Sequence, residues 1–264
     1  MLITVLFAFF LMTLPYTSNV SDRELALYPV IDNSEKLPSP EFCEALWKKL
    51  QHLSSRDIDL LDQVLDKYVA WGDSSKAAGN YSFAKNLYSK ADQLTSLLNL
   101  NNSVIGANVN LNLAECCILA NLQAAQTNMS QTEEALFWVK KYGKFVKPKV
   151  LIENGLTLAA SAAQARDYSL VVLRKMKDSG YNENTTQELL ALAYLARAFE
   201  EIGDAAEAKG NYDKFEHLIG TTNISSQLPY SRIALVEALG GRYYLKTHEG
   251  KKAQELLGRS VEKF

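Results

Sequence analysis

The chain has 264 residues, of which 47% are hydrophobic and 22% are charged, and its formal net charge is −2. This composition is typical of a globular protein that is long enough for one sizeable core or one long solenoid. The near-neutral balance argues against a nucleic-acid partner, which usually requires a clear basic excess. The six prolines and thirteen glycines are too few for a fibrous or disordered chain.

The first 21 residues differ from the rest of the sequence. Residues 2–14 form an almost unbroken apolar run, and no charged side chain precedes Asp22. A run of this length is typical of a secretory signal peptide and is short for a membrane span. We therefore expect residues 1–21 to direct export to a periplasm or to the exterior. The alternatives are an uncleaved membrane anchor at residues 2–14, which would be the chain's only contact with a membrane, and a mis-set start codon or buried strand.

Residues 22–39 contain Pro29 and Pro38 and are predicted to form an extended linker. Ser39 and Pro40 then mark a helix start, because serine is a good N-cap and proline suits the first turn. From this point the apolar residues recur with helical spacing, and no convincing alternating strand pattern occurs. We expect helices over residues 40–53, 56–78, 81–98, 103–127, 131–146, 150–165, 168–179, 184–202, 205–219, 229–246 and 249–263. The short breaks between them, which include Asn128 and Arg166-Asp167, predict antiparallel hairpins.

An internal repeat is visible in this helical region. Segments 79–91 and 203–215 align without a gap, and each has a glycine, an alanine five residues later, a tyrosine four residues after that and a further packing residue. A small residue precedes both segments at the same offset, and segment 237–260 follows the same frame. Segments 128–142 and 164–178 follow it more loosely. The residues that carry the frame are Gly72, Gly79, Ala84, Tyr88, Ala135, Val171, Ala196, Gly203, Ala208, Tyr212, Gly241 and Ala253.

This pattern resembles the tetratricopeptide repeat family, whose unit is a pair of helices. The resemblance is closest over 65–98 and 189–219 and extends to 116–147, 152–180 and 234–263. It implies an all-α fold over residues 40–264, namely a right-handed α-solenoid of about five helix pairs plus an N-terminal helix. The anchor positions are 51, 36, 37 and 45 residues apart, whereas the family repeat is about 34 residues. We therefore expect an irregular superhelix.

The resemblance also implies a binding groove. In this family the first helix of each unit lines an inner groove that holds an extended peptide or a helix, which places Asp73 and Lys76 among the inward positions. The hypothesis is that Arg197, Arg242 and Lys246 engage acidic groups of a partner while Tyr194 stacks nearby. The alternative is that these are solvated surface charges. The predicted partner-binding residues are Asn121, Tyr194, Arg197, Glu201, Arg242 and Lys246.

No catalytic signature accompanies this architecture. The sequence has no HExxH, GxSxG or GxxxxGK[ST] motif, and its three histidines are scattered. We predict no enzymatic activity, no cofactor and no metal, and we expect the three cysteines to be buried packing residues. The sequence thus favours an exported, non-catalytic scaffold that binds a protein or peptide, and the alternative is a secreted effector or surface factor that binds a host or receptor protein. Apolar residues in the last helix also suggest self-association, unless that helix turns a polar face outward.

Overall fold

The computed structural model describes the backbone of residues 37–51, 58–142, 149–178, 185–221 and 230–263. It describes the side chains of residues 37–51, 58–124, 160–178, 186–220 and 231–263. The chain divides into two units, Met1–Pro38 and Ser39–Phe264, and the description below concerns the second. The predicted leader at 1–21 and nearly all of the predicted linker at 22–39 lie outside the described residues.

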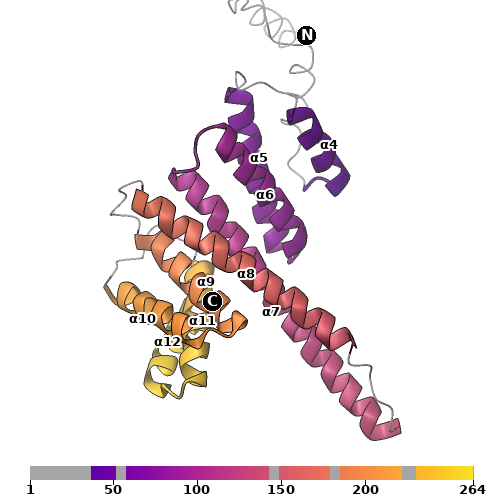
Figure 1. Cartoon of the computed structure of the whole chain (residues 1–264), viewed down its shortest axis with the longest axis vertical. Helices are drawn as coiled ribbons and strands as arrows, with labels where there is room; N and C mark the ends of the chain where they lie inside the picture. Colours follow the sequence, from indigo (N-terminus) through magenta and orange to yellow (C-terminus); the bar gives the residue numbers. More distant parts are fainter. Residues whose placement is uncertain (1–36, 52–57, 143–148, 179–184, 222–229, 264) are drawn as a thin grey trace, which may run out of the picture. The chain divides into compact units, whose positions relative to one another are not determined.

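Within the described ranges the second unit consists of helices and their connections, which confirms the all-α prediction. Figure 1 shows them in chain order. The helices are α4 (Pro40–Leu50), α5 (Ile58–Ala77), α6 (Tyr81–Leu97), α7 (Val104–Tyr142), α8 (Lys149–Asp178), α9 (Thr185–Ile202), α10 (Ala205–Thr221), α11 (Tyr230–Lys246) and α12 (Gly250–Lys263).

The helices pack in the manner of a helical repeat. Helix α5 packs against α6, α7 against α8, α9 against α10, and α11 against α12, so that the chain forms four successive pairs after α4 in the described ranges. The pairs are joined because α6 packs against α7 and α8 against α9. The first helices of the last three pairs also meet, since α9 contacts both α7 and α11. Alternate helices therefore share one side of the unit.

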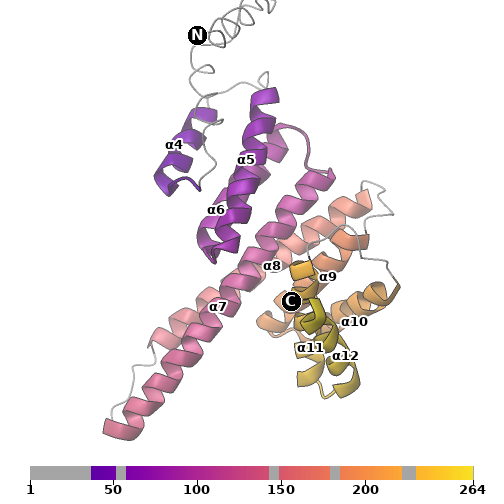
Figure 2. The same cartoon turned by 180° about the vertical axis from the view of Figure 1, so that it is seen from behind.

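The second pair differs from the sequence prediction. We expected helix breaks at Asn128 and at Arg166-Asp167, but α7 continues through the first position and α8 through the second. Neither position has the proline or glycine that would stop a helix, and Ser169 Oγ bonds the Ala165 carbonyl at 2.8 Å without interrupting α8. The two weakest predicted units thus merge into one long hairpin, and four pairs replace the predicted five. Figures 1 and 2 both show this hairpin extending past the helices packed beside it.

Close helix crossings occur at two glycines of the repeat frame. A Cβ atom added at Gly72 would lie 2.6 Å from Tyr88 Cε1, and one added at Gly241 would lie 2.6 Å from Leu257 Cγ. In both pairs the contacted side chain comes sixteen residues after the glycine. A larger residue at either glycine would push the two helices apart. The corresponding fully buried residues of the third pair are Ala196, Ala208 and Tyr212.

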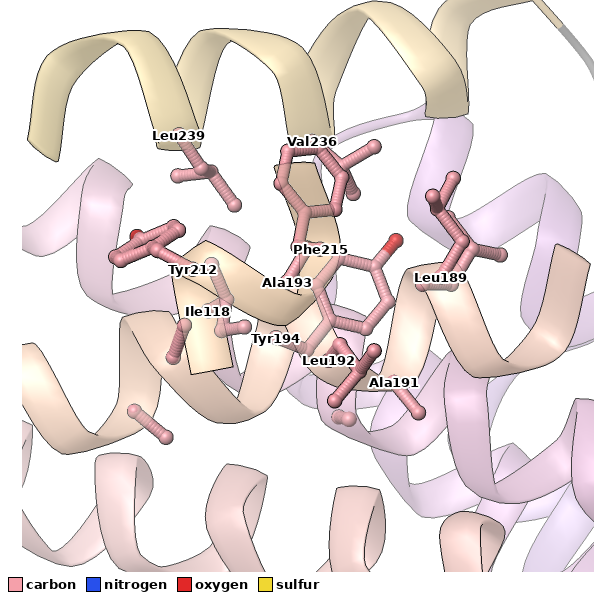
Figure 3. Packing of buried hydrophobic residues seen from close by; sticks show 14 of the residues in the cluster. Ile118, Leu189, Ala191, Leu192, Ala193, Tyr194, Tyr212, Phe215, Val236 and Leu239 are labelled. Atoms are coloured by element: carbon pink, nitrogen blue, oxygen red, sulfur yellow. The ribbon is translucent and has the colours of Figure 1, made fainter. Parts of the chain in front are cut away.

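The main hydrophobic cluster lies between α7, α8, α9, α10, α11 and α12. Figure 3 shows Tyr212 and Phe215 of α10 packed between α9 and the side chains of Val236 and Leu239 on α11. Burial of Phe215, Val236 and Leu239 contributes roughly 1.5–3 kcal/mol each.

The last helix turns a mostly polar face outward. On α12 the buried residues are Ala253, Leu256 and Ser260, whereas Val261 is 75% exposed. The other exposed residues of this helix are Gly250, Lys251, Gln254, Glu255, Gly258 and Glu262. Helix α12 therefore has the polar outer face that a solenoid end requires. Self-association through this helix stays a prediction.

Candidate functional site

A cavity of about 610 Å³ opens on the side formed by α5, α7, α9 and α11. We call this side the inner face. These are the first helices of the four pairs, the class of helix that the family resemblance assigns to the groove. The cavity has the size of a typical ligand site, roughly 300–1,000 Å³. Its lining residues are Val69, Asp73, Lys76, Ala77, Asn108, Asn112, Glu115, Thr186, Gln187, Ser231 and Arg232.

An ion-pair triad crosses the cavity floor. Glu115 Oε2 on α7 lies 3.3 Å from Lys76 Nζ on α5 and 2.6 Å from Arg232 Nη2 on α11. The Glu115 side chain is only 6% exposed, and the two cations are 15% and 16% exposed. Lys76 Nζ also donates to Asn112 Oδ1 at 3.1 Å. One carboxylate therefore joins helices from three of the four pairs.

The rim of the cavity is polar and carries little net charge. Asp73 is 55% exposed, lies 3.9 Å from Lys76 Nζ and accepts a hydrogen bond from the Tyr88 hydroxyl at 2.5 Å. The cavity lining therefore carries two cations, Lys76 and Arg232, and two anions, Asp73 and Glu115. Gln187 Nε2 is 3.5 Å from Asn108 Oδ1, while the buried Gln187 Oε1 has no hydrogen-bond partner in the described part of the chain.

Four of the six predicted partner-binding residues meet in a second polar network. Arg197 is 6% exposed, and its Nη1 and Nη2 lie 2.7 and 2.5 Å from Glu200 Oε2 and Glu201 Oε1. Asn121 Nδ2 on α7 donates to Glu201 Oε2 at 2.5 Å, and Lys246 on α11 pairs with Glu200. Burial alone would raise the pKa of Glu200, but Lys246 and Arg197 hold it below its usual value. We call these five residues the Arg197 network.

The other two predicted residues are not members of this network. Tyr194 is fully buried in the core, so the predicted stacking of its ring against a partner is wrong for this structure. Burial raises the pKa of its hydroxyl, and the neighbouring Glu115 carboxylate raises it further. Tyr194 therefore packs beneath the cavity floor. Arg242, by contrast, is exposed on α11.

The parallel course of α7 and α9 places the cavity and the Arg197 network in line. Asn108 lies beside Gln187, and Asn121 lies beside Glu201, which fixes the direction and register of the two helices. The cavity therefore lies toward the start of α9, and the network lies toward its end.

Sequence reasoning placed Asp73 and Lys76 among the inward positions, and both line the cavity. It missed Glu115 and Arg232. A signal for Glu115 does exist in the sequence, because it is the only charged residue between Asp92 and Glu133. A lone acid in a long uncharged stretch must find a cation if it is buried.

The cysteines form no reactive or metal-binding group in the described ranges. Cys43, Cys116 and Cys117 are free and buried. Burial raises the pKa of Cys43 to about 11 and that of Cys116 to about 12, so both thiols are neutral near pH 7. Among the described residues no cluster of potential metal ligands occurs, and no helix is both long and apolar enough to cross a membrane.

Comparison of the chain with protein-family models, with curated proteins and with solved structures finds no match. The cavity is therefore the feature of the molecule that points to a function.

Proposed function

We propose that this chain is a non-catalytic interaction scaffold, a tetratricopeptide-like solenoid of an exported protein, that binds an extended segment of a partner protein in the cavity of its inner face. The observation that carries the proposal is the cavity lined by the first helix of every pair. The amide and hydroxyl groups of its rim can both donate and accept, which suits a peptide main chain. The triad fixes the position of three of the four helices before a partner arrives, and such preorganisation favours affinity.

Site-specific photocrosslinking tests this proposal. A photoreactive amino acid replaces Asn108 at the cavity in the full chain, which is expressed in its native host and irradiated. The same amino acid at the exposed Gln254 of α12 is the control. We expect a discrete covalent conjugate from the cavity position alone, with the crosslink mapping to one segment of one partner protein.

A blocking variant makes the experiment specific to the cavity. Ala77 lines the cavity and is exposed, so Ala77→Trp should fill the space without disturbing the core. The adjacent Ala78 is equally exposed but does not line the cavity, which makes Ala78→Trp a matched control. We expect Ala77→Trp to abolish the conjugate and Ala78→Trp to retain it. Equal capture by both variants, or capture from Gln254 as well, contradicts the proposal.

A further inference from the structure

The charge arrangement at the cavity floor bears on which partner segment the cavity accepts. Lys76 and Arg232 come from the first and the fourth helix pair, and both reach the same oxygen atom of Glu115. Two cations that face one cavity would ordinarily make it a site for a carboxylate or another anion. Here a carboxylate of the chain itself already occupies the position between them.

This occupancy disfavours charged ligands of either sign. An incoming carboxylate would have to share the two cations with Glu115, and two carboxylates at one site repel each other strongly. Asp73 adds a second negative charge at the rim. An incoming ammonium group would instead face Lys76 and Arg232. A segment without formal charge meets neither penalty.

The remaining groups of the lining suit an uncharged polar segment. Gln187 Oε1 is a buried acceptor and Arg232 Nε is a buried donor, and neither has a hydrogen-bond partner in the described ranges. A main-chain N–H and C=O of a bound segment would satisfy them. The other uncharged polar groups of the lining are Asn108, Asn112, Thr186 and Ser231. Val69 and Ala77 supply apolar surface beside them.

We propose that Glu115 is a built-in counter-ion that keeps the anion position of the cavity filled, so that the cavity selects an uncharged extended segment of its partner. The selectivity part of this inference rests on the proposed function, whereas the counter-ion part does not. The sequence agrees with a dedicated role, because Glu115 is the only charged residue in positions 93–132.

Chemical rescue tests the counter-ion without any partner. Glu115→Ala in the full chain leaves Lys76 and Arg232 facing an empty anion position. We expect its Tm to fall and then to rise by at least about 2 °C in sodium propionate relative to sodium chloride of equal concentration. Propionamide, which has the same shape without the charge, should give no such rise. If Glu115→Ala does not fold in chloride, recovery of the folded chain in propionate alone is the equivalent result.

The matched control for the rescue is Glu201→Ala. Glu201 also pairs with a buried arginine, but it belongs to the Arg197 network and does not line the cavity. We expect no selective response of this variant to propionate. Equal responses of both variants, or a Glu115→Ala variant that responds to propionate no more than to chloride, would overturn the counter-ion assignment.

Selection from a random peptide display library tests the selectivity. The wild-type chain should enrich peptides whose central residues are uncharged, and this binding should be lost in Ala77→Trp. Glu115→Gln should shift the enriched sequences toward Asp and Glu, with at least about a tenfold gain in affinity for acidic peptides. Adding Lys76→Gln should cancel that gain. Enrichment of acidic peptides by the wild-type chain overturns the inference and leaves the proposed function standing, whereas a lack of cavity-dependent peptides contradicts the proposed function itself.

Discussion

Arg197 and Arg242 occupy equivalent positions in two successive repeat units, each one residue after the small residue of the crossing. Their surroundings nevertheless differ. Arg197 is 6% exposed between two glutamates, whereas Arg242 is exposed on α11. The repeat frame gives the position of a residue along its helix, but neighbouring helices decide its burial. Two of the three cations of the predicted basic groove, Arg197 and Lys246, are therefore paired with glutamates of the same chain.

Charge reversal at these two positions should change stability by very different amounts. Arg197→Glu removes the buried cation that Glu200 and Glu201 share, leaves Glu200 with Lys246 alone and adds a third acid, so we expect the free energy of unfolding to fall by about 3–5 kcal/mol. Arg242→Glu should stay within about 0.5 kcal/mol of the wild type, because it changes an exposed side chain. Urea denaturation of both variants measures the difference. If Arg197→Glu also stays within about 0.5 kcal/mol of the wild type, the Arg197 network adds no stability. Because Arg197→Glu is expected to destabilise the fold, a test of partner binding should use Arg242→Glu alone.

At the level of helix pairs, the small residue at each crossing sets how closely two helices approach. Gly72 of α5 faces the Tyr88 ring, and the Tyr88 hydroxyl is held by Asp73 Oδ1 at 2.5 Å. The ring is fully buried and therefore has little freedom to move away. We expect Gly72→Ala to lower the free energy of unfolding by about 1–3 kcal/mol, although alanine is the better helix former.

The same substitution elsewhere supplies the control. Gly210 of α10 is exposed, and no atom lies within 4 Å of a Cβ added there. Gly210→Ala should therefore raise the free energy of unfolding by up to about 1 kcal/mol through helix propensity alone. Thermal unfolding monitored by circular dichroism distinguishes the two signs. A stabilised Gly72→Ala variant would contradict the close crossing of α5 and α6.

The helices were largely predictable because their signals are local. Ser39 caps α4 with its Oγ 3.3 Å from the Phe42 amide nitrogen, and Asn80 caps α6 in the same way. The merged helices α7 and α8 were not predicted, since a polar residue such as Asn128 marks either a turn or a helix surface depending on what packs around it. For the cavity, the sequence predicted only that the first helices of the pairs line an inner face. Its triad joins Lys76, Glu115 and Arg232, and no local pattern links residues so far apart in sequence.

At the scale of the whole molecule, the reactivity of two cysteines can show which part of the helical unit opens first. Repeat proteins are nearly one-dimensional, so their ends can open separately from their centre. Cys43 lies in α4, the first described helix of the unit, whereas Cys116 lies in α7 between packed pairs. Both thiols are at most 1% exposed. A reagent must therefore wait for local opening to reach either of them.

The thiols also make stability depend on pH in a defined direction. Burial raises the pKa of Cys43 to about 11 and that of Cys116 to about 12, from an ordinary value of 9.0. As the pH rises above 9, the unfolded chain therefore loses these protons before the folded chain does. The stability that the neutral thiols provide is fully present below pH 9 and is lost as the pH rises through 11 and 12.

The position of each thiol in the unit predicts the order in which the thiols react. Once a segment opens, its thiol is exposed to water and has its ordinary pKa, so the rate of alkylation follows how often that segment opens. We expect iodoacetamide to alkylate Cys43 before Cys116 between pH 8 and pH 10, because α4 is the first described helix of the unit whereas α7 lies between packed pairs. Mass spectrometry of peptides from the full chain, sampled over time, measures both rates. Equal rates at every pH would show that the end and the centre open together, and the unit would then unfold as one cooperative body instead of from its ends.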